Sequence, residues 1–212
     1  MKNFIFLFFI SLSIACTSCD VTDPVDETVD PVDDPADPVD EVIDPVSDMH
    51  GGSPTPVIWD TCGGMIGDHP CDFSLVDQNG DIFQLYDNYG KVILLDFSSI
   101  WCGVCNNIAH HAQSFTEEFI DENFLWVTIL IDGNTHGVPP TESDISDWCT
   151  QHSIEDSPVL LGNRSLIDLT AEAGWPVSAW PTLVIINREM IVSHGIHGWS
   201  EETMREWLGE VL

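Results

Sequence analysis

Apolar and polar positions along residues 57–212 alternate in a way that predicts strands and helices following one another. Residues 92–97 form an apolar run with one acidic member and predict a central strand that is buried on both faces. The stretch after Cys102 carries apolar residues at helical spacing, so it predicts an amphipathic helix that ends near Asn123. Residues 124–131 predict the next strand, which is parallel because a crossover helix precedes it.

Shorter elements complete this pattern. An Asn-Gly turn at 78–81 predicts a β-hairpin, because these residues tolerate positive φ values. A final helix is expected after Ser200, whose side chain can cap it. The remaining predictions are strands at 73–76, 82–85, 159–161, 183–186 and 191–197, and helices over 143–152 and 165–173.

These elements predict an α/β fold in which a mixed central sheet carries helices on both faces. The fold has an N-terminal β-hairpin extension and an insertion over residues 132–174. About 156 residues, from 57 to 212, are enough for one domain with its own hydrophobic core.

Cys102 and Cys105 lie where the central strand is expected to pass into the helix. The first turn of a helix has unpaired N–H groups and a positive dipole end, and both favour a thiolate over a thiol. We therefore expect Cys102 to be a nucleophile and Cys105, one turn further on, to form a disulfide with it. A structural zinc site would need a second such pair, and Cys62, Cys71 and Cys149 do not repeat this spacing.

The segment 94–105, which contains Trp101-Cys102-Gly103-Val104-Cys105, resembles the active site of thioredoxins. Trp180-Pro181-Thr182 before the strand at 183–186 resembles their cis-proline loop. The lead-in at 67–75, the turn at 78–81 and the segment 90–92 are similar to the membrane-tethered, extracytoplasmic TlpA/ResA-type branch. The resemblance covers residues 57–212. It implies a thioredoxin fold and thiol-disulfide exchange with client proteins, without a cofactor.

Several roles follow from the resemblance residue by residue. Cys102 matches the attacking cysteine, Cys105 the resolving one, and Pro181 the cis-proline that positions the substrate backbone. Asp96 matches a buried acid that assists proton transfer, a role that burial would support by raising its pKa. The alternative is that Asp96 points outward and is solvated. The substrate groove is expected to include Trp101, Trp180 and Thr182.

Three positions depart from the family pattern. Val104 replaces a proline that is common between the two cysteines, and His110 stands where a proline usually kinks the helix. Trp180 precedes the expected cis-proline, where a smaller residue is usual, and would crowd or stack in the groove. These changes leave the redox potential and the choice of client open.

The first 19 residues predict an export signal, with Lys2 followed by a short apolar core. Ser13-Ile14-Ala15-Cys16 resembles a bacterial lipoprotein processing box, so Cys16 is the expected lipidation site. Cleavage without lipidation, or use of Cys19, are the alternatives. This predicts an exported protein on the periplasmic side or the cell surface, anchored to a bacterial membrane through lipid.

Residues 20–56 have a different composition, with Asp-Pro-Val units, twelve acidic residues and no Lys or Arg. Repeated prolines and like charges predict an extended, disordered linker. Calcium binding by these aspartates is an alternative, but the acidic and glycine positions do not follow a calcium-loop pattern. The formal charge of the whole chain is −31, which argues against nucleic acid as a partner. The expected partners are a client protein, a membrane thiol-disulfide relay protein and the membrane itself.

The remaining cysteines and histidines define the alternatives to this function. We expect a structural disulfide between Cys62 and Cys71, because an exported protein meets oxidising conditions and a glycine-rich segment joins the two. Cys149 is expected to be a buried thiol. A copper-binding chaperone of the same fold is one alternative, with His136 as the one plausible remote ligand, although no metal site is predicted. A non-catalytic surface lipoprotein is the other.

Overall fold

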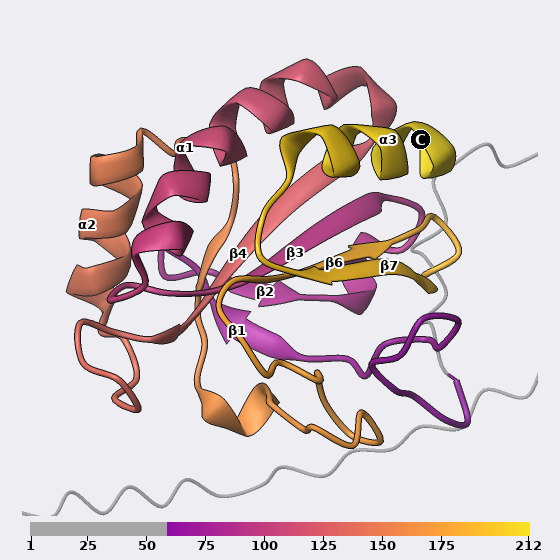
Figure 1. Ribbon diagram of the computed structural model, residues 1–212, viewed down its shortest axis with the longest axis horizontal. Coiled ribbons are helices and arrows are strands. Elements are labelled where there is room, and N and C mark those ends of the chain that lie inside the picture. Colours follow the sequence, from indigo (N-terminus) through magenta and orange to yellow (C-terminus); the bar gives the residue numbers. More distant parts are fainter. Residues whose placement is uncertain (1–58) are drawn as a thin grey trace, which may run out of the picture. The chain divides into compact units, whose positions relative to one another are not determined.

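The computed structural model describes residues 59–212, which contain a five-stranded mixed sheet of order β5-β4-β3-β6-β7 (Figure 1). Strands β3, β4 and β5 are parallel, and β6 and β7 run antiparallel to their neighbours. A separate hairpin of β1 and β2 precedes this sheet. The strands are β1 Ser74–Val76, β2 Ile82–Gln84, β3 Val92–Ser99, β4 Phe124–Asp132, β5 Val159–Leu161, β6 Thr182–Ile186 and β7 Val192–His197.

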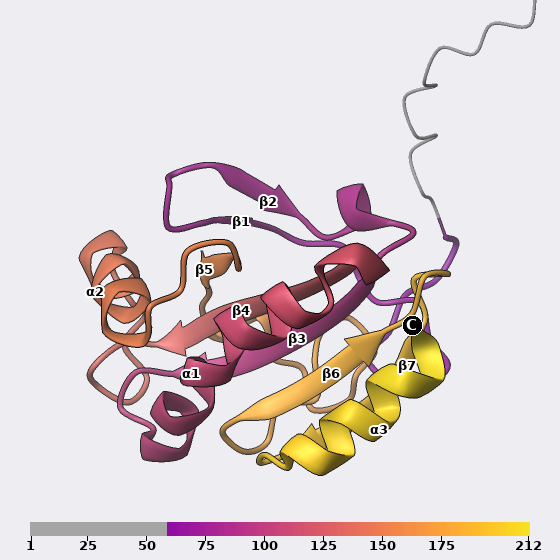
Figure 2. The ribbon, with the colours of Figure 1, turned by 90° about the horizontal axis from the view of Figure 1, so that it is seen from above.

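Residues 59–212 also contain three α-helices and three short 3-10 turns. The helices are α1 Gly103–Glu118, α2 Glu142–His152 and α3 Glu201–Val211. The 3-10 turns are η1 Tyr86–Asn88, η2 Ile120–Glu122 and η3 Arg164–Leu166. Helices α1 and α3 lie across the same side of the sheet, and α2 lies at the end of the sheet beside β5 (Figures 1 and 2).

Strand β3 separates two hydrophobic clusters, because its side chains alternate between the faces of the sheet. Val92 and Leu94 belong to the cluster beneath the helices. Ile93, Leu95 and Phe97 belong to the cluster on the other face. All eight residues of β3 are buried, as expected for a strand at the centre of the domain.

The thioredoxin fold and its N-terminal hairpin are confirmed, but the predicted helix over 165–173 is wrong. This segment forms the single turn η3, and then Trp175 N donates to Leu166 O and Asp168 N donates to Trp175 O. The Asp168 carboxylate accepts hydrogen bonds from the backbone of Thr170, Glu172 and Ala173. This side chain thus competes with helical hydrogen bonding. The face opposite α1 is consequently covered by the β1–β2 hairpin, irregular chain and short turns, and no α-helix of the described residues lies on it.

Helix α2 begins one residue earlier than the sequence predicts. Thr141 caps it, because its hydroxyl accepts from Asp144 N while the Asp144 carboxylate accepts from Thr141 N.

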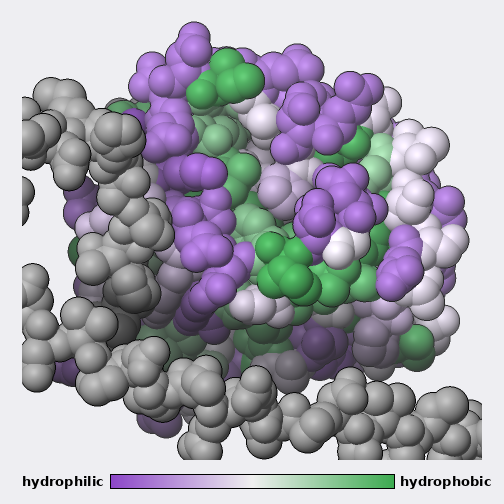
Figure 3. Space-filling view, turned by 180° about the vertical axis from the view of Figure 1, so that it is seen from behind, coloured by the Kyte–Doolittle hydropathy of each residue, from purple (hydrophilic) through white to green (hydrophobic). Residues whose placement is uncertain are grey.

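Seen from behind the view of Figure 1, apolar side chains gather in groups that hydrophilic side chains border (Figure 3).

The described part of the chain has no helix long and apolar enough to cross a membrane. The predicted export signal, the lipidation site at Cys16 and the acidic linker over 20–56 lie outside the described residues.

Candidate active site

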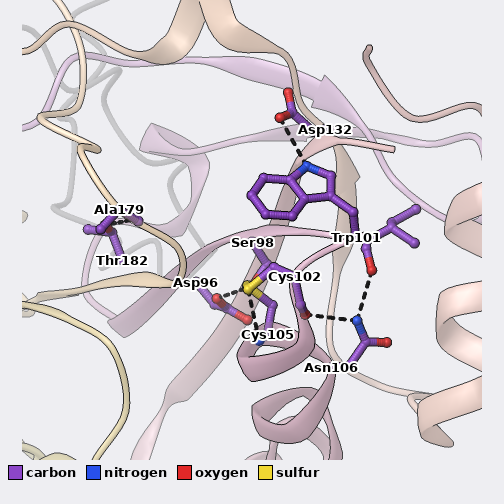
Figure 4. Close-up of a disulfide and its surroundings, with 10 residues drawn as sticks. Asp96, Ser98, Trp101, Cys102, Cys105, Asn106, Asp132, Ala179 and Thr182 are labelled. Carbon is purple, nitrogen blue, oxygen red and sulfur yellow. Dashed lines mark hydrogen bonds between the residues drawn. A yellow bond between two sulfur atoms is a disulfide. The ribbon is translucent and has the colours of Figure 1, made fainter. Parts of the chain in front are cut away.

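Cys102 and Cys105 lie at the junction of β3 and α1 and are joined by a disulfide (Figure 4). Cys102 is the N-cap of α1, and its Sγ accepts a hydrogen bond from Cys105 N at 3.1 Å. Cys105 is fully buried, and 6% of the surface of Cys102 is exposed. Cys102 is therefore the more accessible of the two cysteines and lies at the positive end of the helix, where a thiolate is stabilised.

Asn106 holds the turn that leads into this helix. Its side-chain amide donates to Ile100 O at 2.8 Å and to Cys102 O at 2.9 Å. Gln151 of α2 in turn donates to the Asn106 Oδ1 atom at 3.0 Å. These bonds fix the backbone on both sides of Trp101, so the position of Cys102 does not depend on the disulfide alone.

Asp96 lies on β3 and faces the same side of the sheet as Val92 and Leu94, the side on which α1 carries Cys105. Its carboxylate accepts from Ser98 Oγ at 2.6 Å and from Thr128 Oγ1 at 3.4 Å. Burial raises the pKa of Asp96 to about 7, although both hydroxyl hydrogen bonds act in the opposite direction. The alternative of a solvated Asp96 is excluded, because the residue is fully buried.

The loop before β6 contains the cis peptide bond Trp180-Pro181. Thr182 pairs with Phe97 of β3, so continuing this register places Pro181 beside Ser98, close to the start of α1. Thr182 Oγ1 donates to Ala179 O and lies 2.8 Å from His197 Nδ1, which ties this loop to β7. Trp180 is half-buried and packs against both hydrophobic clusters.

A cleft of about 550 Å³ opens beside Thr182 and His197. Met65 and Ile66 also line it, and both are exposed. They belong to the loop that the disulfide between Cys62 and Cys71 closes.

Trp101 lies on the other side of the disulfide from Thr182 in the view of Figure 4. Its indole Nε1 donates to Asp132 Oδ2 at 3.2 Å, and 41% of the residue is exposed. Arg164 donates two further hydrogen bonds to the Asp132 carboxylate, through Nε at 2.9 Å and through Nη2 at 2.7 Å. Burial would raise the pKa of Asp132, but the hydrogen bonds from Arg164, Gly137 and Trp101 and the guanidinium charge lower it to about 2.

Sequence reasoning missed Asn106, Asp132 and Arg164. Asp132 carries the one available signal, since it is an acidic residue directly after an apolar run. Arg164 lies 32 residues further along the chain, within the segment predicted as insertion. Cys149 is half-buried, and burial raises the pKa of its thiol to about 11, so it is a poor nucleophile at neutral pH.

His110 and His152 are in ring contact, with centroids 4.6 Å apart, and the histidines considered below lie elsewhere. His136 Nε2 is 3.1 Å from Arg164 Nη2, and its ring faces Trp101. His194 stacks on Trp207, whereas His197 contacts Thr182. Residues 59–212 contain no group of three or more His, Cys, Asp or Glu residues that could hold a metal ion.

Comparison with known proteins agrees with this fold. The AhpC/TSA family matches residues 66–194, which is more than half of the chain. A thioredoxin from Coprinus comatus is 33% identical over 72 residues, which are 34% of this chain and 60% of that protein. The chain therefore matches less than two thirds of the length of this curated relative.

Solved structures with the same fold include three from bacteria. An exposed lipoprotein thioredoxin of Streptococcus pneumoniae has a TM-score of 0.55 and 24% identity, covering 66% of this chain and 99% of its own. A thioredoxin-family thiol:disulfide interchange protein of Chlorobium tepidum has a TM-score of 0.56 and 18% identity, covering 73% and 99%. The thioredoxin domain of a thiol-disulfide oxidoreductase of Bacteroides vulgatus has a TM-score of 0.55 and 15% identity, covering 71% and 99%.

The fold and the family match together thus define a thioredoxin-like protein. The chain belongs to the AhpC/TSA family. The predicted thioredoxin-like class is confirmed at the level of this family, and thiol-disulfide exchange stays a prediction.

Proposed function

We propose that this protein is a membrane-tethered enzyme that exchanges the Cys102–Cys105 pair with disulfides of client proteins. The observation that carries the proposal is the position of the pair, with Cys102 at the N-cap of α1 and 6% exposed, and Cys105 fully buried. The buried Asp96 on the same face of the sheet supports it further, because a carboxyl with a pKa of about 7 can accept and return a proton near neutral pH.

In the reductive direction, the Cys102 thiolate attacks one sulfur of a client disulfide. The bond between Cys102 Sγ and that sulfur forms, the client S–S bond breaks, and the departing client thiolate takes up a proton. The helix N-terminus and the Cys105 N–H group, which already donates to Cys102 Sγ, stabilise the attacking thiolate.

The second step resolves the mixed disulfide. Cys105 transfers its proton to the Asp96 carboxylate and attacks Cys102 Sγ, and the second client sulfur leaves as a thiolate. The client has then gained two electrons and the protein pair has lost two, which gives the disulfide form described above. Pro181, Trp101, Trp180 and Thr182 are proposed to present the client backbone to Cys102.

A further turnover needs a reductant for the Cys102–Cys105 disulfide. We propose a membrane thiol-disulfide relay protein as this partner and Cys16 as the lipid anchor that keeps the domain near it. The export signal pattern over residues 1–19 and the likeness to an exposed lipoprotein thioredoxin support this arrangement.

Reduction of insulin by the purified protein, with a small dithiol as reductant, tests the activity. We expect turnover by the unaltered protein, none by Cys102→Ser, and a trapped mixed disulfide with Cys105→Ser. Cys149→Ser is the matched control, because its thiol is half-buried and lies outside the pair. If the unaltered protein and Cys102→Ser reduced insulin at the same rate, the proposal would be refuted.

A further inference from the structure

The Asp132 carboxylate, fully buried at the end of β4, connects two residues that are far apart in the sequence. It binds the Trp101 indole, next to the attacking cysteine, and the guanidinium of Arg164. The guanidinium contact is bidentate, which fixes the orientation of the carboxylate as well as neutralising its charge.

Arg164 begins η3, and the chain before it is packed firmly against the sheet. Gly162 N donates to Leu130 O of β4, and a Cβ atom on Gly162 would lie only 2.8 Å from that oxygen. Asn163 then caps η3 by accepting from Ser165 N at 2.8 Å. The base of the Arg164 side chain is thus held close to Asp132. The chain has only five Lys and Arg residues beside 36 acidic ones, so few cations are available for this place.

The Trp101 ring has few other restraints. It is 41% exposed, and its ring faces His136 at a centroid distance of 5.4 Å. The His136 ring is itself next to Arg164, so one guanidinium contacts both groups that border the indole. An exposed side chain without such contacts would populate several rotamers, and a client would have to select among them.

We propose that Arg164 is a positioning residue for disulfide exchange, which holds the Trp101 indole through Asp132 in the orientation that presents a client to Cys102. This inference rests on the proposed function. Loss of the guanidinium leaves the Asp132 carboxylate buried without a cation, so the carboxylate must bind a proton or admit water. Either change weakens the hydrogen bond from the indole and releases the ring.

Arg164→Gln tests the proposal, and Arg205→Gln is its matched control. Arg205 also binds carboxylates, those of Glu118 and Glu201, and its side chain is 39% exposed compared with 43% for Arg164. The measurements are kcat and KM for insulin and for a small aromatic disulfide, and the NMR signal of the Trp101 indole N–H. Because the chain has eight Trp residues, Trp101→Phe assigns that signal.

We expect Arg164→Gln to move or broaden the Trp101 indole signal and to lower kcat/KM for insulin by about tenfold, mainly through KM. The loss on the small disulfide should be several times smaller, because that substrate needs little positioning. Arg164→Lys keeps the charge but not the bidentate contact, so it should restore part of the loss. It also serves as the test if the Gln variant does not fold.

The proposal is overturned if Arg164→Gln matches Arg205→Gln in both the indole signal and the insulin kinetics. It is also overturned if both substrates lose the same factor, since that result indicates a general structural role. A lack of turnover by the unaltered protein would instead refute the proposed function, and the role of Arg164 in exchange with it.

Discussion

Asp96 and Asp132 are two fully buried carboxylates on neighbouring parallel strands, yet the pKa of Asp96 is raised and that of Asp132 is lowered. Asp96 has only the hydroxyl groups of Ser98 and Thr128 as partners, and burial raises its pKa to about 7. Asp132 is equally inaccessible, but the two hydrogen bonds and the charge of Arg164 contribute to lowering its pKa to about 2.

The difference shows that the partner, and not burial alone, decides what a buried carboxylate can do. A carboxyl that is half-protonated near neutral pH can exchange protons with Cys105 during turnover. A carboxylate that stays ionised over the same range is a constant acceptor for the Trp101 indole. Under the proposed function, one site therefore contains a proton carrier and a fixed anion, and the following experiments separate the two roles.

The largest expected effect is on the rate at which the mixed disulfide is resolved. Asp96→Asn should slow this step by about 10²-fold at pH 7, because the proton acceptor for Cys105 is lost. In the unaltered protein the rate of resolution should rise with pH through about 7, as Asp96 ionises. This rise in rate should be absent in the variant. Rapid acid quenching followed by mass spectrometry measures the lifetime of the mixed disulfide.

Asp132→Asn provides the comparison for that experiment. It should retain the rise in rate near pH 7, because Asp132 is ionised throughout that range. The distinction between the two carboxylates would fail if Asp132→Asn removed the rise and Asp96→Asn kept it.

Stability should respond to Asp96 in the opposite sense from an acid that a cation holds ionised, such as Asp132. Its pKa is raised on folding from 3.8 to about 7, so its favourable contribution is complete below pH 3.8 and is lost as the pH rises through 7. Between these limits the unaltered protein should lose roughly 4 kcal/mol relative to Asp96→Asn. Urea unfolding of both proteins at a series of pH values measures this difference, and a constant difference would contradict the raised pKa.

Arg164→Gln should destabilise the protein at neutral pH by about 1 to 3 kcal/mol, less than for a fully buried pair because 43% of the Arg164 side chain is exposed. The pKa of Asp132 is lowered on folding, so its contribution is present above pH 3.8 and is lost as the pH falls towards 2. The difference from the unaltered protein should therefore shrink in acid. A difference that grows in acid would show that Arg164 stabilises the fold by other contacts.

The smallest effects should come from the hydroxyl partners of Asp96. Ser98→Ala should raise the pKa of Asp96 further, because the hydroxyl bond at 2.6 Å stabilises the charged form. Thr128→Val should raise it less, because that bond is 3.4 Å long. Carbon-13 NMR titration of the Asp96 carboxyl gives both shifts, and the reverse order would contradict this assignment of partners.

The sequence predicts those parts of the site that depend on residues close together along the chain. Cys102 and Cys105 are three residues apart at a strand-to-helix boundary, and the apolar neighbours of Asp96 indicate its burial. The contact of Arg164 with Asp132 spans 32 residues and depends on how η3 docks on β4, which no local pattern contains.

The failed helix over 165–173 has a related cause. Its apolar spacing is compatible with a helix, but the Asp168 side chain binds the backbone that a helix would use. Ala171 also has a positive φ of 60°, which ends any helical path there. Periodicity describes which residues can be buried, and it does not report this competition for backbone hydrogen bonds.

Equilibration of the purified protein in glutathione buffers, followed by alkylation and mass spectrometry, tests the central claim most directly. We expect Cys102 and Cys105 to become alkylated together in one two-electron transition, at a potential around −270 mV if the protein is a reductase. Cys62 and Cys71 should remain bonded in those buffers, because structural disulfides have lower potentials. A Cys102–Cys105 pair that stays bonded, or stays reduced, across the whole range would contradict the proposed exchange.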